Sequence, residues 1–216
     1  MAVMTGNSAV KLRDGFILLA IVVNITYFKW RSNQPPAGNV KPISTVSASD
    51  IIGEATGVLG DKSAPYVLVE FGDYQCPPCA RLFPQIDDVL SRNRSKLRFQ
   101  FRQYPLPGHE MAFPAAMLAE SARSCGRFEQ VHRALYALGA KVQQSDLDAI
   151  AKTYGVRRPS DSTPTDLDKQ LEARIVSDKV QASKLPIEGT PSLYLCTPDQ
   201  KVLEVYNAAQ ISELIK

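Results

Sequence analysis

Residues 66–79 read YVLVEFGDYQCPPC, and this stretch decides the fold. Its first half, residues 66–71, is apolar and rich in β-forming side chains, which is typical of a buried strand. Gly72 and Asp73 then end the strand. The pair Cys76 and Cys79 opens a segment whose apolar residues recur at helical spacing, and proline is favoured in the first turn of a helix. The stretch therefore predicts a strand, a turn, and a helix that begins at a Cys-x-x-Cys motif.

A half-buried strand is predicted at residues 97–101, because the sequence LRFQF alternates between apolar and polar side chains. With the first strand and the helix between them, it makes a βαβ unit with a parallel pair. A helical block follows, with glycines at plausible helix ends, and the chain then closes with a hairpin and a helix. The predicted helices span residues 111–125, 128–138, 146–154, 165–185 and 208–216, and the hairpin strands span residues 192–195 and 202–206.

The Cys-x-x-Cys motif favours redox chemistry over metal binding. A cysteine at a helix N-terminus faces the positive end of the helix dipole, which stabilises its thiolate and lowers its pKa. We therefore expect Cys76 to be the exposed nucleophile and Cys79 the buried resolving thiol. A zinc site would need a second ligand pair, whereas Cys125 and Cys196 are isolated in the sequence. We expect no metal and no other cofactor.

Three short segments carry a family resemblance. FGDYQCPPC (71–79), the helical block, and GTP (189–191) ahead of the hairpin resemble the DsbA-like branch of the thioredoxin superfamily. The resemblance implies an α/β thioredoxin fold. A helical insertion at about residues 105–185 would separate the βαβ half from the hairpin-and-helix half. It also implies a cis bond between Thr190 and Pro191, in a loop that lies against the active-site disulfide and pairs with an extended substrate segment.

Glu70 lies six residues before Cys76, inside the apolar strand. If its side chain points inward, it sits beneath the disulfide, and burial raises the pKa of such a carboxyl. It could then accept or return the proton of Cys79, and the resembling family carries an acid at this position. The alternative is an edge residue that points to water.

The dipeptide Pro77-Pro78 departs from DsbA itself, where the second position is a histidine. Two prolines remove two backbone amides that could otherwise face the thiolate. No imidazolium stands between the cysteines either. We therefore expect the pKa of Cys76 to be less depressed, and the redox couple less oxidising, than in the strongest oxidants of the family.

The remaining cysteines and histidines carry weaker signals. Cys125 ends a predicted helix and Cys196 ends a predicted strand, so a second disulfide and two free thiols both stay open. His109 precedes a helix, where a cap or a local hydrogen bond is expected. His132 falls on the apolar face of its helix and is expected in the core.

Composition excludes several classes of protein. The chain has 216 residues with 44% hydrophobic and 22% charged side chains, which is ordinary globular usage. Its net charge of +3 comes from the first 50 residues, since the remaining residues hold 20 charges of each sign. A neutral domain argues against a nucleic-acid partner. We read the basic cluster between Arg92 and Arg102 as a solvated face.

The N-terminal region has the composition of a targeting segment. We expect a cytoplasmic stub over residues 1–14, an apolar segment over 15–30, a Pro- and Ser-rich linker over 31–50, and the folded domain over 51–216. The apolar segment suits an uncleaved signal-anchor or a cleaved signal peptide, and the lack of a small-x-small cleavage pattern favours the anchor. The domain would then lie outside the cytoplasm as a single-pass, membrane-anchored protein.

These observations predict a thiol–disulfide oxidoreductase that exchanges a Cys76–Cys79 disulfide with secreted proteins through a mixed disulfide at Cys76. The leading expectation is an oxidant acting on unfolded chains. The resemblance implies a membrane redox partner of the DsbB or VKOR type. The alternatives are an extracytoplasmic reductase, for example in cytochrome c maturation, and a non-catalytic chaperone or adaptor of the same fold.

Overall fold

A computed structural model describes residues 40–53, 57–160 and 163–216. The predicted cytoplasmic stub, the apolar segment and the first part of the linker lie outside the described residues. Within the described ranges, none of the helices has the length and apolar character needed to cross a membrane.

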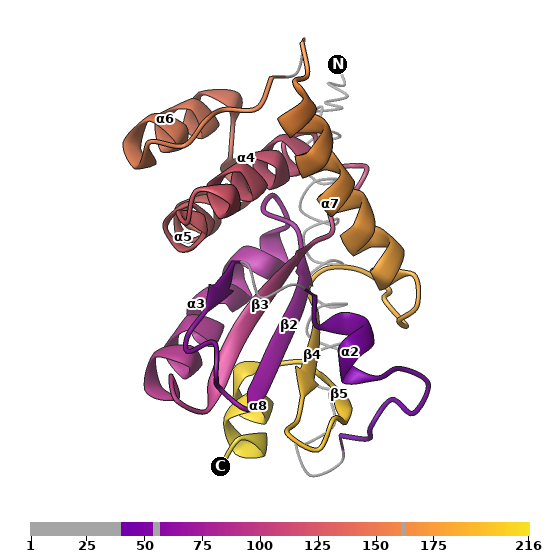
Figure 1. Cartoon of the computed structure of the whole chain (residues 1–216). Coiled ribbons are helices and arrows are strands. Elements are labelled where there is room, and N and C mark those ends of the chain that lie inside the picture. Colours follow the sequence, from indigo (N-terminus) through magenta and orange to yellow (C-terminus); the bar gives the residue numbers. More distant parts are fainter. Residues whose placement is uncertain (1–39, 54–56, 161–162) are drawn as a thin grey trace, which may run out of the picture. The chain divides into compact units, whose positions relative to one another are not determined.

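A mixed sheet forms the centre of the described domain (Figure 1). Its strand order is β1-β3-β2-β4-β5. Strand β2 runs parallel to β3 and antiparallel to β4, as expected for the meeting of a βαβ half with a hairpin half. The strands are β1 (Val58–Leu59), β2 (Tyr66–Gly72), β3 (Leu97–Gln103), β4 (Ser192–Cys196) and β5 (Val202–Val205).

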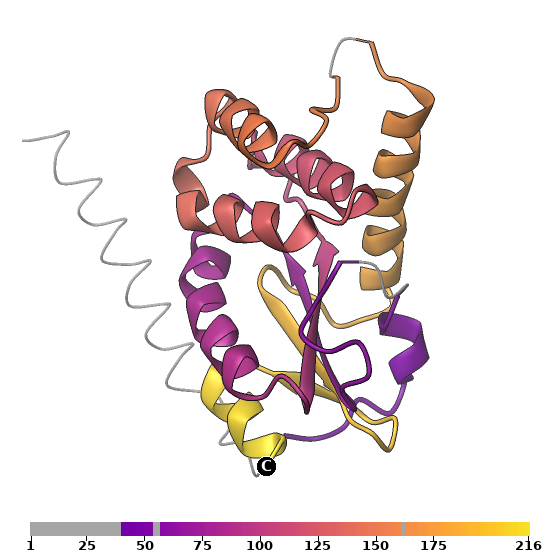
Figure 2. The same cartoon turned by 60° about the vertical axis from the view of Figure 1, so that its left-hand side comes forward.

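Helices cover both faces of the sheet (Figures 1 and 2). One face packs against α3 (Pro77–Arg92) and α8 (Ala208–Leu214), and the core there includes Ile86 and Phe99. The other face packs against α2 (Ala48–Ile51) and the end of α7. Because β2 is buried on both faces, its sequence is a continuous apolar run rather than an alternating one.

The helical insertion lies between β3 and β4, as the resemblance implies. Gly126, Gly139 and Gly155 follow three of its helices with positive φ angles, which confirms their predicted place at helix ends. The helices are α4 (Ala112–Ser124), α5 (Phe128–Leu138), a short 3-10 turn η2 (Gly139–Lys141), α6 (Gln144–Tyr154) and α7 (Asp166–Ala182). The fold is thus the mixed α/β thioredoxin-like fold with the expected insertion.

The folded part of the chain begins before residue 51. Ala48 and Ile51 are fully buried against the sheet, and Pro42 forms an isolated β-bridge with Leu203. The end of the stretch assigned to the linker therefore belongs to the core. Its Ser- and Pro-rich composition hid this, because helix α2 buries only two side chains in a single turn.

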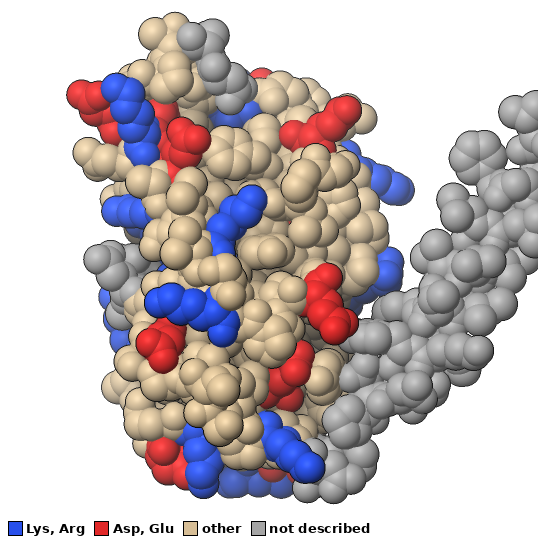
Figure 3. Space-filling model, turned by 90° about the vertical axis from the view of Figure 1, so that its right-hand side faces the viewer, with Lys and Arg blue, Asp and Glu red and all other residues tan. Residues whose placement is uncertain are grey.

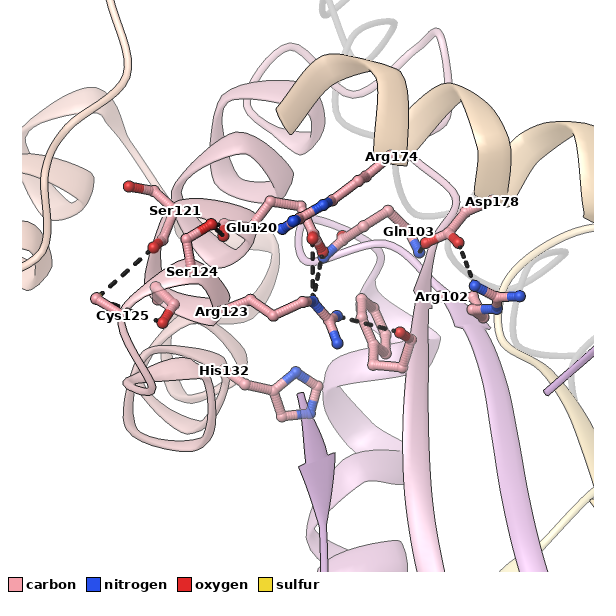
Figure 4. A network of polar contacts seen from close by, with 12 residues as sticks. Arg102, Gln103, Glu120, Ser121, Arg123, Ser124, Cys125, His132, Arg174 and Asp178 are labelled. Carbon is pink, nitrogen blue, oxygen red and sulfur yellow. Dashed lines mark hydrogen bonds and ion pairs between the residues drawn. The ribbon is translucent and has the colours of Figure 1, made fainter. Parts of the chain in front are cut away.

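One buried ion pair and several hydrogen bonds tie the insertion to the sheet (Figure 4). Glu120 on α4 accepts hydrogen bonds from Arg123 at 3.0 Å and from the Gln103 side chain at 3.1 Å. Asp178 on α7 accepts from Arg102 at 2.7 Å and from the Gln103 backbone at 2.8 Å. Arg102 is therefore buried, which corrects its assignment to a solvated basic face.

The surface beside α7 carries charges of both signs (Figure 3). Lys and Arg side chains alternate there with Asp and Glu side chains, and broad areas of other residues separate them. No single-sign field extends across this face. This distribution agrees with the near-neutral balance of the domain sequence.

Candidate active site

The two cysteines of the motif lie at the start of α3. Cys76 is the N-cap residue, Pro77 and Pro78 occupy the first helical positions, and Cys79 follows in the first turn. Proline fits these positions because the first amides of a helix have no partner within the helix. The backbone carbonyl of Cys76 accepts the first helical hydrogen bond, from Ala80 at 3.2 Å. The motif thus places Cys76 at the positive end of the helix dipole.

Cys76 is less exposed than expected. Its relative exposure is 3%, and that of Cys79 is 0%. The Cys76 thiol lies 3.3 Å from the backbone carbonyl of Thr190, so the loop before β4 covers it. The prediction of an exposed nucleophile is therefore wrong for this state, in which both thiols are free.

The surroundings shift the pKa values of the two thiols in opposite directions. A hydrogen bond from the Cys79 side chain, with a further one from the Cys79 backbone, lowers the pKa of Cys76 to about 6 against the cost of burial. Burial raises the pKa of Cys79 well above its ordinary value, and Cys76 and Glu70 add to the rise. Cys76 is the thiol that ionises near neutral pH. Its pKa lies above the value of about 3.5 found in the strongest oxidant of this class, as the Pro-Pro pair predicts.

The bond between Thr190 and Pro191 is cis, as the resemblance implies. The Thr190 carbonyl faces the Cys76 sulfur, and Ser192 then opens β4. The Ser192 hydroxyl donates to the Gly189 carbonyl at 2.8 Å, which closes the loop on itself. The loop and the cysteine pair, 114 residues apart in the chain, thus form one site.

Glu70 points into the protein, which excludes the alternative of a solvent-facing edge residue. Its side chain lies on β2 and is 0% exposed. Burial raises its pKa to about 8, a hydrogen bond from Tyr136 opposes the rise, and the nearby Cys76 adds to it. The carboxyl is therefore mostly protonated at neutral pH, which is the state needed to give a proton to a thiolate.

Two residues that sequence reasoning did not single out shape the loop before Cys76. Asp73 is buried, and its carboxylate accepts hydrogen bonds from the backbones of Gln75 at 2.7 Å and Leu106 at 3.0 Å. It also lies 2.7 Å from the Nδ1 atom of His109, a contact between residues 36 apart in the chain rather than the cap or local hydrogen bond expected for this histidine. The Gln75 side chain accepts from the Met111 backbone at 2.7 Å. A buried Asp directly before the aromatic turn residue Tyr74 gave no recognisable signal.

Cys125 and Cys196 are not brought together. Cys125 is exposed at the end of α4, and its thiol faces the carbonyls of its own helix. Cys196 is buried at the end of β4 in the core beside α2, where burial raises its pKa to about 12. Both are free thiols, so the second disulfide that the sequence left open does not form in this structure. Among the described residues, no group of three or more acidic, His or Cys side chains is placed to hold a metal.

Comparisons with known proteins agree with this geometry. The model of the thioredoxin family matches residues 53–216, so the chain belongs to that family. A thioredoxin-like oxidoreductase from Silicibacter pomeroyi DSS-3 has a similar structure, with a TM-score of 0.63 and 26% identity over 78% of this chain and 95% of that chain. The thiol-disulfide exchange protein alpha-DsbA2 from Wolbachia pipientis shares the fold, with a TM-score of 0.62 and 17% identity over 77% of this chain and 89% of that one.

A curated relative adds a match of a different kind. The Na(+)/H(+) antiporter NhaA 1 of Mycobacterium sp. (strain KMS) is 30% identical over 161 residues, which cover 72% of this chain and 26% of the antiporter. The chain thus spans about a quarter of the length of that relative. The chain therefore has the fold of the thioredoxin family and carries a cysteine pair at a helix start, an arrangement suited to thiol–disulfide exchange.

Proposed function

We propose that this protein introduces disulfides into unfolded or cysteine-containing proteins outside the cytoplasm. The observation that supports oxidation over reduction is the difference between the pKa values of the two thiols. The pKa of Cys76 is lowered and that of Cys79 is raised. A stabilised thiolate favours the reduced form of the pair, and a couple with a stable reduced form is an oxidant. Tethering by the apolar N-terminal segment, and reoxidation by a membrane partner of the DsbB or VKOR type, complete the proposal.

The disulfide passes from the protein to the substrate in two thiol–disulfide exchange steps. A substrate thiolate attacks the Cys76 sulfur of the Cys76–Cys79 disulfide, that bond breaks, and Cys79 leaves as a thiolate that takes a proton from Glu70. A second substrate thiolate then attacks the substrate sulfur of the mixed disulfide and releases Cys76 as a thiolate. The substrate loses two electrons and gains a disulfide, and the protein gains both electrons as a dithiol. The loop at Thr190 and Pro191 would pair with the extended substrate strand.

The test is oxidation of a reduced, unfolded dithiol peptide by the disulfide form of the protein. Cys76→Ser should abolish the reaction. Cys79→Ser, given the same peptide with its two thiols joined in a disulfide, should accumulate a mixed disulfide, because Cys76 attacks the peptide disulfide and the second peptide thiol leaves. Cys125→Ser is the matched control, because it removes a thiol outside the site. Full activity of Cys76→Ser would contradict the proposal and favour a binding module without turnover.

A reductase is the second candidate, and the Pro-Pro dipeptide favours it. Equilibrium with glutathione measures the reduction potential of the Cys76–Cys79 couple directly. A value near −120 mV would support the oxidant, and a value near −270 mV would support the reductase.

A further inference from the structure

Helix α5 of the insertion reaches the buried acid beneath the cysteine pair. The hydroxyl of Tyr136 donates a hydrogen bond to Oε1 of Glu70 at 3.0 Å, and both groups are buried. The second oxygen, Oε2, is buried without a hydrogen-bond partner. Among the described residues, no Lys or Arg forms an ion pair with Glu70. One tyrosine hydroxyl thus anchors this carboxyl within the part of the chain that the structure describes.

The ring of Tyr136 is held on several sides. It stacks on Phe83 with centroids 4.9 Å apart and contacts Tyr74 at 5.0 Å and His132 at 4.9 Å. A ring packed this way has little rotational freedom, so its hydroxyl has a fixed position. Burial raises the pKa of Tyr136 well above its ordinary value, so the hydroxyl keeps its proton and stays a donor.

Gly72 leaves space for the hydrogen bond between Tyr136 and Glu70. Gly72 lies two residues after Glu70 on β2, so both face the same side of the sheet. A Cβ atom at Gly72 would lie 2.4 Å from the Phe101 ring, 2.7 Å from Oε1 of Glu70 and 2.8 Å from the Tyr136 hydroxyl. Any larger residue there would displace the ring and the two hydrogen-bonded groups. The need for space, rather than for a left-handed backbone, accounts for this glycine.

We propose that Tyr136 is a positioning residue for thiol–disulfide exchange, which fixes the carboxyl of Glu70 by one oxygen and leaves the other to exchange a proton with Cys79. In the step that resolves a mixed disulfide, Glu70 in its ionised form takes the proton of Cys79, and the Cys79 thiolate attacks the Cys76 sulfur. The bond between Cys76 and the substrate breaks, and the substrate leaves as a thiolate. The reverse step returns the proton. The role rests on the exchange chemistry of the site but not on its direction.

The effect of the hydroxyl on Glu70 has a definite sign. A donor stabilises the ionised carboxylate more than the protonated acid, so its loss disfavours the ionised form. The titratable groups that face Glu70 are Cys76 and Cys79 at the start of α3, Tyr74 in the turn, and Tyr136 on α5. In the oxidised protein Cys76 and Cys79 do not titrate because they form a disulfide, and the two tyrosines do not ionise in the neutral range.

The experiment is a pH titration of the oxidised protein labelled with ¹³C at the glutamate carboxyls, with Glu70→Gln to assign the signal. Tyr136→Phe should raise the pKa of Glu70 by about one unit, because a hydrogen bond to the charged carboxylate is stronger than one to the neutral acid. The midpoint of the pH profile for resolution of a mixed disulfide should move by the same amount.

Tyr74→Phe is the matched control. It removes a buried tyrosine hydroxyl from the same aromatic cluster, but that hydroxyl bonds Nδ1 of His132 at 2.9 Å rather than Glu70. A pKa of Glu70 that is unchanged in Tyr136→Phe, or shifted equally in both variants, would overturn the proposal.

A second variant guards against a folding defect. Replacement of Tyr136 by 3-fluorotyrosine keeps the ring and the hydroxyl but makes the hydroxyl a stronger donor, so the pKa of Glu70 should fall, and no change would again overturn the role. The titration needs no substrate. A protein that shows these shifts but exchanges disulfides only as a reductant would refute the proposed function and leave the positioning role intact, whereas a protein that exchanges no disulfides would refute both.

Discussion

Two buried acidic centres in this domain have opposite surroundings. At the junction of the insertion and the sheet, Asp178 pairs with Arg102 at 2.7 Å and Glu120 pairs with Arg123 at 3.0 Å. Beneath the cysteines, Glu70 has a tyrosine hydroxyl as its partner and a buried oxygen with none. All three carboxyls lie in the interior, so burial alone does not distinguish them.

The difference lies in the cations. Burial raises the pKa of Asp178 to about 6 while the charge of Arg102 opposes the rise, so the group is ionised at neutral pH. Burial raises the pKa of Glu70 to about 8 with no cation to oppose it. The first centre therefore holds a fixed charge pair that joins two structural units. The second holds a proton that can be exchanged near neutral pH.

The largest expected effect comes from breaking the paired centre. Arg102→Met should lower the free energy of unfolding by about 3–5 kcal/mol, because it leaves the Asp178 carboxylate buried without its cation. Urea unfolding at neutral pH measures the loss. The double variant Arg102→Met/Asp178→Leu is the control, and it should recover a large part of the stability. A loss below about 1 kcal/mol in the single variant would mean that the pair is solvated in solution.

A smaller effect, with a definite pH dependence, is expected at the unpaired centre. The pKa of Glu70 is about 8 in the folded protein against 4.5 for a free side chain. Between these values the folded state binds one more proton, so Glu70 makes stability fall as pH rises, by about 1.4 kcal/mol per unit. Glu70→Gln should remove this slope and leave the oxidised protein about 3 kcal/mol more stable at pH 7 relative to wild type.

Unfolding of the oxidised protein at several pH values checks this slope, since oxidation keeps both active-site thiols from titrating. The matched control is Tyr136→Phe, which should keep the slope and extend it to higher pH. Equal slopes in wild type and Glu70→Gln would show that Glu70 is ionised in the folded protein.

The smallest effects are expected at the two remaining cysteines, where burial differs but no ion pair is involved. Cys196→Ser places a hydroxyl in an apolar core and should cost about 1–3 kcal/mol. Cys125→Ser changes an exposed helix end and should stay within about 0.5 kcal/mol. Thermal unfolding under reducing conditions compares the two, and equal losses would contradict the burial assigned here.

The local sequence predicts one of these centres and hides the other. An acid inside an apolar strand, at a fixed distance before a Cys-x-x-Cys motif, is visible in the sequence, and so are the helix start, the insertion and the Thr-Pro loop. The pair of Arg102 and Asp178 is not visible, because the two residues are 76 apart in the chain and their contact depends on how α7 packs on β3. Arg102 therefore looked like one member of a surface cluster.

The same limit explains the other differences. Tyr136 occupies an apolar-periodic position on α5, and periodicity reports that a ring is buried but not what its hydroxyl touches. The cover over Cys76 comes from a loop more than a hundred residues away. Helix α2 is too short to give a periodic pattern, so residues 42–50 resembled a linker.

The measurement that tests the account most directly is the pH dependence of thiol labelling in the reduced wild-type protein. Iodoacetamide reacts with thiolates, and mass spectrometry of the digested protein assigns each modified cysteine. Because the pKa of Cys76 is about 6 and that of Cys79 is raised well above its ordinary value, we predict that Cys76 is labelled with a midpoint near pH 6. Cys79 should stay unlabelled into the alkaline range. A midpoint for Cys76 near its ordinary value of 9.0, or faster labelling of Cys79, would contradict it.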